Sequence, residues 1–219
     1  MSTPEERALK TADPTSAPAQ SYRIVGLIAV VAVLLSLFQL YAAGIEPLGL
    51  FYQRSIHLAF IMVLAFLMFP VFGRRGRGPV GWIIDAAFIA ASIASGAYIV
   101  WNLDAIFARA GFWSETDIWM AVLTTVTVLE ASRRAIGLPM TLIGVVAILY
   151  GFAGPRGELP WLGEWLPGIL SHRGNSLSRL AGQLYLGQEG IYGLPLGVAA
   201  TYIFVFVLFG AFLEVTGAG

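Results

Sequence analysis

The sequence of 219 residues contains no cysteine, and charged residues make up only 12% of it. The absence of cysteine excludes disulfide bonds, thiolate-bound iron–sulfur clusters and cysteine-based zinc sites. Ordinary soluble domains are about 25% charged and about 45–50% apolar, whereas 58% of this chain is hydrophobic. Such a chain has too few charged residues to cover the surface of a water-soluble protein, and it is too apolar for extended disorder. The composition therefore predicts that lipid is the solvent for most of the protein.

An excess of charge of either sign is also missing, since 13 basic residues balance 13 acidic ones. A neutral chain has no basic footprint for nucleic acid. The sequence lacks a Gly-x-Gly-x-x-Gly loop, a Walker loop and a His-x-x-x-His pair, and it has only two histidines. We therefore expect a protein that is not an enzyme, with no catalytic residue, no metal ligand and no cofactor in this chain.

Long uncharged runs are what the sequence has in abundance. A helix needs about 20 residues to cross a bilayer core of about 30 Å, and none of the runs alternates as a barrel strand does. The runs cover residues 24–45, 55–73, 86–103, 118–129, 135–155 and 190–213. The fourth is short and needs Asp117 or Glu130 at the headgroups. The pattern predicts an all-α fold, a polytopic transmembrane helical bundle of about six spans.

The basic residues between these runs indicate the orientation. If all six runs cross, eight of the 13 basic residues fall on one side: Arg7, Lys10, Arg23, Arg74, Arg75, Arg77, Arg133 and Arg134. The positive-inside rule then predicts a cytoplasmic N-terminus. A cleaved signal peptide is the alternative for the first run, but that run exceeds the usual apolar length of about 7–15 residues. We therefore expect it to stay as a membrane anchor.

Two segments outside the runs have distinct patterns. Residues 1–23 are rich in Pro, Ser, Thr and Ala and predict a mobile cytoplasmic tail. The outer loop of residues 154–189 ends in a helical pattern over residues 177–185, which Ser176 is suited to cap. This amphipathic helix is expected to lie on the membrane surface or against a partner, or else to form a lid over its own bundle.

Few ionisable side chains accompany the runs, and such residues are often functional in membranes. Asp85 either joins an ion path or is stabilised by the start of its helix or by the arginines of residues 74–77. His57 is expected near an outer end, within reach of headgroups. Glu130 and Arg134 are four residues apart, so one helix face can pair them. Glu214 is expected at the cytoplasmic interface.

Small residues and prolines predict how the helices pack. Ala87, Ala91 and Ser95 recur every four residues, as do Ser92 and Gly96, and this spacing lets helix backbones approach closely. Pro139 and Pro195 stand where helices are expected to start, a position that tolerates proline. These features indicate a bundle and identify no substrate.

One long string of motifs resembles a known family. The string begins with LEASRRAIGLP at residues 129–139 and continues with LPGILSHRG at 166–174, SLSRL at 176–180 and LYL at 184–186. It ends with EGIYGLPLGVAAT at 189–201 and FVFVLFGAFLE at 204–214. Residues 117–219 thereby resemble the fused small-plus-large-subunit permease of tripartite ATP-independent periplasmic (TRAP) transporters, of the TAXI-associated type.

The resemblance implies a multi-pass symport protein of the bacterial inner membrane. Such a permease takes up organic acids or similar solutes from a periplasmic solute-binding protein, driven by an ion gradient, usually of sodium. The resemblance divides the chain into three parts. Residues 1–23 form the tail, residues 24–116 are of small-subunit type, and residues 117–219 begin the large subunit. The substrate and ion sites are expected beyond Gly219, in the remaining large-subunit transport region, so no ligand residue is assigned here. The competing hypothesis is a non-transporting membrane anchor or assembly subunit.

Overall fold

The computed structural model describes residues 19–45, 48–73, 78–109 and 111–217, and over these residues the fold is helical. The main helices are α2 (Ala19–Gly44), α3 (Leu50–Met68), α4 (Pro79–Ala108), α5 (Glu115–Ala135), α6 (Leu138–Phe152) and α10 (Phe204–Thr216). Shorter ones are α7 (Pro160–Gly163), η2 (Gly168–Leu170), α8 (Leu177–Ala181), η3 (Gly182–Leu186), α9 (Leu194–Val198) and η4 (Ala199–Ile203). In this described part the only β pairing is one bridge between Ala153 and Leu159. The all-α prediction is confirmed.

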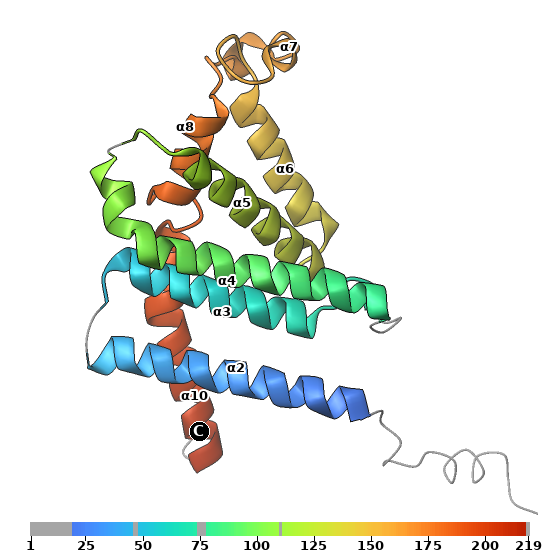
Figure 1. Ribbon diagram of the computed structural model, residues 1–219, viewed down its shortest axis with the longest axis vertical. Coiled ribbons are helices and arrows are strands. Elements are labelled where there is room, and N and C mark those ends of the chain that lie inside the picture. Colours follow the sequence, from blue (N-terminus) through green and yellow to red (C-terminus); the bar gives the residue numbers. More distant parts are fainter. Residues whose placement is uncertain (1–18, 46–47, 74–77, 110, 218–219) are drawn as a thin grey trace, which may run out of the picture.

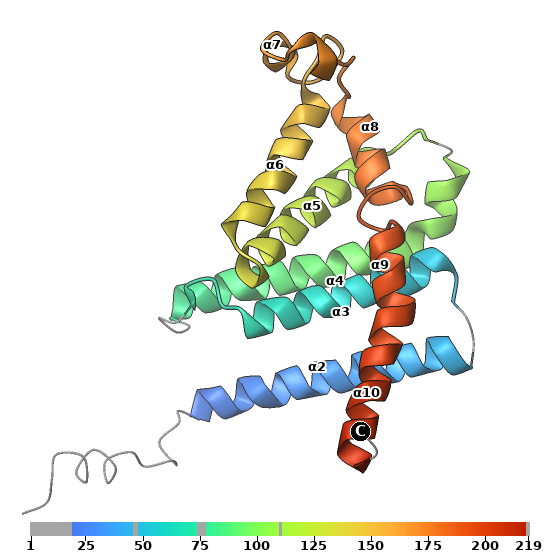
Figure 2. The ribbon, with the colours of Figure 1, turned by 180° about the vertical axis from the view of Figure 1, so that it is seen from behind.

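The helices are arranged as a layer, a hairpin and a column (Figure 1). Helices α2, α3 and α4 lie side by side, while α5 and α6 form a hairpin that leads away from them to the α7 tip. The α8–α10 column returns from that tip and runs across the layer, as the view from behind also shows (Figure 2). The expected N-terminal tail lies outside the described residues up to residue 18, and α2 begins at Ala19.

Four helical segments are long and apolar enough to cross a membrane: Ile24–Gly44, Leu50–Met68, Pro79–Ala108 and Leu194–Thr216. They correspond to the first, second, third and sixth expected spans. The second ends at Met68, shortly before Pro70, because proline restricts the residue that precedes it. The third extends beyond Asp85 in the N-terminal direction because that carboxylate is paired, as described below. Several long apolar helices are compatible with a multi-pass membrane protein.

The other two expected spans are helical but differ from the four. Helix α6 has 15 residues, which gives a length of about 22 Å against a bilayer core of about 30 Å. Helix α5 is long enough, but it carries Glu115 and Asp117 in its first turn and Arg133 and Arg134 in its last. Helix α6 therefore differs from the four spanning candidates in its length, and α5 differs from them in its charged ends.

Small residues bring α3 and α4 together, as their spacing predicts. Ser92, Ser95 and Gly96 are buried in α4. A Cβ added at Gly96 would lie 2.8 Å from the Cβ of Ala59 and 3.3 Å from the carbonyl oxygen of Ser55. Only glycine fits this contact. Ala87, from the same stripe, is exposed.

The predicted helix over residues 177–185 forms as α8 followed by the π-helical turn η3. The Ser176 hydroxyl accepts a hydrogen bond from the Arg179 N–H, which confirms the cap. Ala181, Tyr185 and Leu186 are buried and belong to the main core, with residues of α3, α4 and α5. Of the expected alternatives, the structure therefore shows the lid over its own bundle.

Candidate functional site

An ionic cluster joins the start of α4 to the end of α5. The Arg134 Nη1 lies 2.5 Å from Asp85 Oδ1, and these side chains are 2% and 1% exposed. The Arg134 Nε donates to Glu130 Oε1 at 2.7 Å. Arg133 donates to the same carboxylate through Nε and Nη2, each at 2.7 Å. Two arginines and two carboxylates thus share one network.

The surroundings of Arg134 compensate for its burial. Its guanidinium carbon lies 4.9 Å from the ring centre of Phe66 and 5.3 Å from that of Phe88, which places a cation against two aromatic faces. Its Nη1 also donates to the carbonyl oxygen of Phe69 at 3.3 Å. Hydrogen bonds from Arg133, and then from Arg134, lower the pKa of Glu130. The carboxylate therefore stays ionised at neutral pH.

The cluster revises the sequence expectation for Asp85. Its ion-pair partner is Arg134 of α5, 49 positions away, and not only the start of its own helix. Arg74, Arg75 and Arg77 lie outside the described residues. The Glu130–Arg134 pairing is confirmed.

A hollow of about 460 Å³ opens beside the cluster. Its lining comes from the segment after α3 and from the end of α5: Phe69, Pro70, Val71, Gly73, Arg133 and Arg134. The backbone N–H of Val71 donates to Asp85 Oδ1 at 3.3 Å, which ties this segment to α4. Among the described residues of its wall, the hollow therefore has two guanidinium groups and no other charged side chain.

A second polar cluster is buried between α2, α3 and η4. The Gln39 Nε2 and the His57 Nδ1 are 2.6 Å apart. The Gln53 Nε2 donates to Gln39 Oε1 and to the carbonyl oxygen of Ala200, both at 3.4 Å. The expectation that headgroups and water reach His57 is wrong, because this ring is 4% exposed and packs edge-on against Phe204.

Arg54 connects α3, beside this second polar cluster, to the α8–α10 column. Its Nη1 donates to the carbonyl oxygen of Tyr192 at 2.6 Å. A Cβ added at Gly197 would lie 2.5 Å from Nη2 of this guanidinium. The glycine in α9 therefore leaves the space that Arg54 occupies. Its Nε is buried without a hydrogen-bond partner.

A third polar cluster caps the start of α5. Ser114 and Asp117 form a capping box, with the Ser114 N–H donating to Asp117 Oδ2 at 2.8 Å. The hydroxyl of Tyr98 donates to Asp117 Oδ1 at 2.6 Å, and Arg109 Nη2 does so at 2.8 Å. Asp117 is completely buried. Its carboxylate oxygens are held by Ser114, Tyr98 and Arg109.

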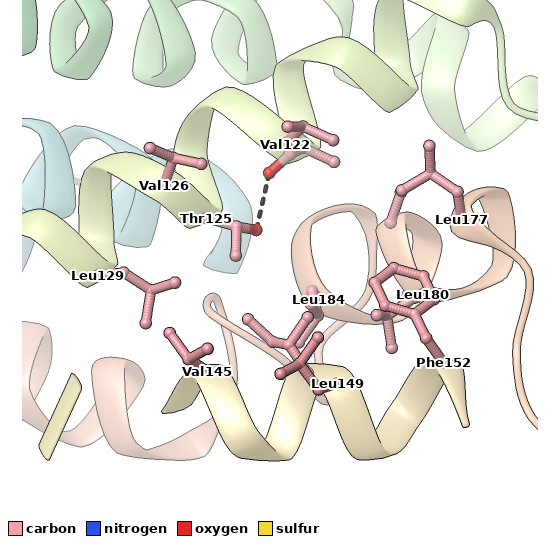
Figure 3. A pocket seen from close by; sticks show the side chains of 13 residues that line it. Val122, Thr125, Val126, Leu129, Val145, Leu149, Phe152, Leu177, Leu180 and Leu184 are labelled. Atoms are coloured by element: carbon pink, nitrogen blue, oxygen red, sulfur yellow. Dashed lines mark hydrogen bonds between the residues drawn. The ribbon is translucent and has the colours of Figure 1, made fainter. Parts of the chain in front are cut away.

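The groove between α5, α6 and α8 is apolar (Figure 3). It has a volume of about 260 Å³ and is lined by aliphatic side chains, Phe152 and Thr125. The Thr125 hydroxyl donates to the Ala121 carbonyl at 2.7 Å, which is the dashed line in Figure 3. The lining of the groove is therefore almost entirely apolar, and the proton of its one side-chain hydroxyl is already donated.

The ionisable residues singled out in the sequence are thus distributed over separate places. Asp85 and Glu130, which belong to different helices, both bind Arg134. His57 belongs to the amide cluster, and Glu214 is exposed on α10. Within the described ranges, no group of three or more His, Asp or Glu side chains is placed to hold a metal ion.

Sequence reasoning missed Gln39, Gln53 and the Asp117 partners. A search for charged residues passes over glutamine, although an amide inside an apolar run is itself a signal because it needs a partner in lipid. Tyr98 and Arg109 have no such signal, since their contact with Asp117 depends on how α4 meets α5.

Comparison with models of protein families, with curated proteins and with solved structures gave no match for this chain. What the fold and the clusters define is a class. The protein is all-helical in its described part, with four apolar helices fit to span a membrane and buried polar groups that mostly bind one another.

Proposed function

We propose that this chain is the membrane-embedded scaffold part of a TRAP-type secondary transporter. The complete transporter would use an ion gradient, with sodium as the coupling ion, to import organic acids or similar solutes delivered by a periplasmic solute-binding protein. The remaining large-subunit transport region would hold the substrate and ion sites. The resemblance of residues 117–219 supports the family, and the arrangement of buried polar groups supports the scaffold role.

The observation that carries the scaffold role is the internal pairing of buried polar side chains. Asp85 binds Arg134, Asp117 binds Arg109, and His57 binds Gln39. Each pair joins two helices, and such networks rigidify a bundle when their members are satisfied. A scaffold against which a transport domain moves needs this kind of fixed framework.

The exposed apolar surface of the column supports the same role. In the most apolar stretch of Leu194–Thr216, only 11% is buried inside the protein. Phe206, Phe209 and Phe212 are 72%, 57% and 64% exposed. So much apolar surface requires lipid or further protein around it. The transport region of the same permease is the protein that we propose for one side of this column.

We also propose six spans with the N-terminus in the cytoplasm of a bacterium with an inner membrane. The start of α2, the end of α3, the start of α4 and the α5–α6 turn lie toward the same end of the layer (Figure 1). Contact of Arg134 with Phe69 and Asp85 supports the same grouping. These places adjoin the basic segments of the sequence, which the positive-inside rule assigns to the cytoplasm.

The absence of cysteine makes the orientation directly testable. Single cysteines at Ile45, Phe112 and Ile169, which are 76%, 85% and 98% exposed, should react with an impermeant maleimide on intact spheroplasts. A cysteine at Ile136, which is 71% exposed in the α5–α6 turn, should react only after permeabilisation. Labelling of Ile136→Cys in intact cells would reverse the orientation or, together with labelling of Phe112→Cys, remove α5 as a span.

The transporter assignment is tested by crosslinking to a defined binding protein. A photoreactive residue replacing Trp165, 83% exposed in the loop after α7, should crosslink the purified solute-binding protein encoded beside this gene. The same residue placed at Ile136 is the matched control and should give no product. Lack of any product at Trp165, or a genome without such a neighbour, would count against a TRAP-type permease.

The alternative is a non-transporting anchor or assembly subunit. The apolar groove of Figure 3 favours it, because nothing in that groove selects a polar solute. An anchor would stay in the membrane and give no crosslink to a solute-binding protein. An enzyme is not proposed, since Asp85 and Glu130 are held in ion pairs and His57 lies in a different cluster.

A further inference from the structure

Arg134 has one more hydrogen-bonding group than its protein partners use. Its Nη1 and Nε are bound to Asp85, Phe69 and Glu130. Its Nη2 is buried and has no hydrogen-bond partner, although this side chain lines the hollow beside the cluster. Buried donors without an acceptor are few in native proteins and unfavourable. The free Nη2 therefore points to an acceptor that the described part of the protein does not provide.

Arg133 gives the same hollow a second guanidinium. Its Nε and Nη2 bind Glu130, and its side chain is 37% exposed. The carboxylates of Asp85 and Glu130 balance the two positive charges, but both are already engaged with these guanidinium groups. Attraction of a ligand here thus depends on the remaining N–H donors at short range. Guanidinium groups bind phosphate oxygens particularly well.

The position of the hollow relative to the membrane indicates which phosphate compound it would bind. Its wall begins at Phe69 and Pro70, directly after the apolar segment Leu50–Met68 ends. The end of a spanning segment is where lipid headgroups lie. Basic pockets between transmembrane helices on the cytoplasmic side are suited to anionic headgroups.

We propose that the hollow lined by Arg133 and Arg134 binds the phosphate of an anionic phospholipid headgroup. The phosphate oxygens accept hydrogen bonds from Arg134 Nη2 and from Arg133. The lipid then bridges the segment after α3 to the end of α5 and stabilises the junction that Asp85 and Arg134 form. This inference rests on the membrane location proposed above and not on the transporter class.

The test is the thermal unfolding of the purified full chain in detergent with added lipid. Phosphatidylglycerol should raise the melting temperature, whereas phosphatidylcholine should not, because its quaternary ammonium is repelled by Arg133. Arg133→Gln should weaken the apparent affinity for phosphatidylglycerol about tenfold or more, the loss expected for one charged hydrogen bond. Arg179→Gln is the matched control, since Arg179 is exposed on α8 and lies outside the hollow.

Each other outcome has a definite meaning. Equal affinities of wild type and Arg133→Gln, or no effect of phosphatidylglycerol on wild type, overturns the proposal. Stabilisation by inorganic phosphate alone shows a free-anion site and overturns the lipid assignment. Arg134→Lys, which keeps the charge and removes the planar donor fork, should lose lipid stabilisation as well. Membrane fractionation of the wild type is scored separately, so failure of the membrane location is distinguishable from failure of the site.

Discussion

Replacing Asp85 with alanine is expected to destabilise the folded chain by about 3–5 kcal/mol, the range for breaking a buried ion pair by removing one partner. After the substitution, Glu130 is the one carboxylate of the cluster that remains. It then balances both Arg133 and the Arg134 guanidinium, which is 2% exposed. It also removes the acceptor for the Val71 N–H. The measurement is the free energy of unfolding in mixed micelles, followed by tryptophan fluorescence.

The matched control for Asp85 is on the same helix. Asp104 is exposed on α4, and Asp104→Ala should change the free energy of unfolding by about 0.5 kcal/mol or less. The double variant Asp85→Leu/Arg134→Leu should be less destabilised than Asp85→Ala. When both charged side chains are removed, no buried charge of this pair remains without its partner. An Asp85→Ala effect as small as that of Asp104→Ala would contradict the ionic cluster.

Replacing Tyr185 with alanine is expected to cost about 3–5 kcal/mol, the range for truncating a buried aromatic side chain to alanine. Tyr185 is completely buried in the main core, with its ring 5.6 Å from that of Tyr192. Its hydroxyl donates to the Ser95 carbonyl at 2.8 Å. Truncation leaves a cavity where η3 packs on α4 and α5. The same unfolding assay measures the loss.

Two further variants separate the parts of the Tyr185 effect. Tyr185→Phe keeps the ring and removes one hydrogen bond, so it should cost about 0.5–1.5 kcal/mol. Tyr202→Ala is the control, since Tyr202 is 65% exposed on η4, and its effect should be about 0.5 kcal/mol or less. If Tyr185→Ala and Tyr202→Ala had similar effects, α8 and η3 would not form a lid on the bundle.

Burial raises the pKa of Tyr185 above that of a free phenol. Tyr185 therefore stays neutral throughout the physiological range and donates its hydrogen bond to Ser95. Its place in the core explains why the loop leading into the column is fixed to the bundle. The ionic cluster holds the opposite end of α5, so two contacts of different chemistry anchor this helix.

Composition and periodicity were sufficient for the class of fold. Apolar runs in a chain with 12% charged residues leave a helix as the form in which a single segment satisfies its own backbone in lipid. Four of the runs became helices with the length and hydropathy of spans. Local signals also placed the Ser176 cap, the prolines at the starts of α6 and α9, and the close contact at Gly96. Each of these depends on residues a few positions apart.

Only the tertiary structure decided which polar groups meet. The sequence analysis considered only the start of its own helix and nearby arginines as partners for Asp85, whereas the packing of α4 on α5 brings Arg134 to it from 49 positions away. Gln39 and His57 are 18 positions apart on different helices, yet they share a buried hydrogen bond. The reason is physical: helix formation follows from local backbone hydrogen bonds and burial, whereas a contact between helices depends on the rotation, shift and crossing of both. The sequence of one helix does not specify those quantities.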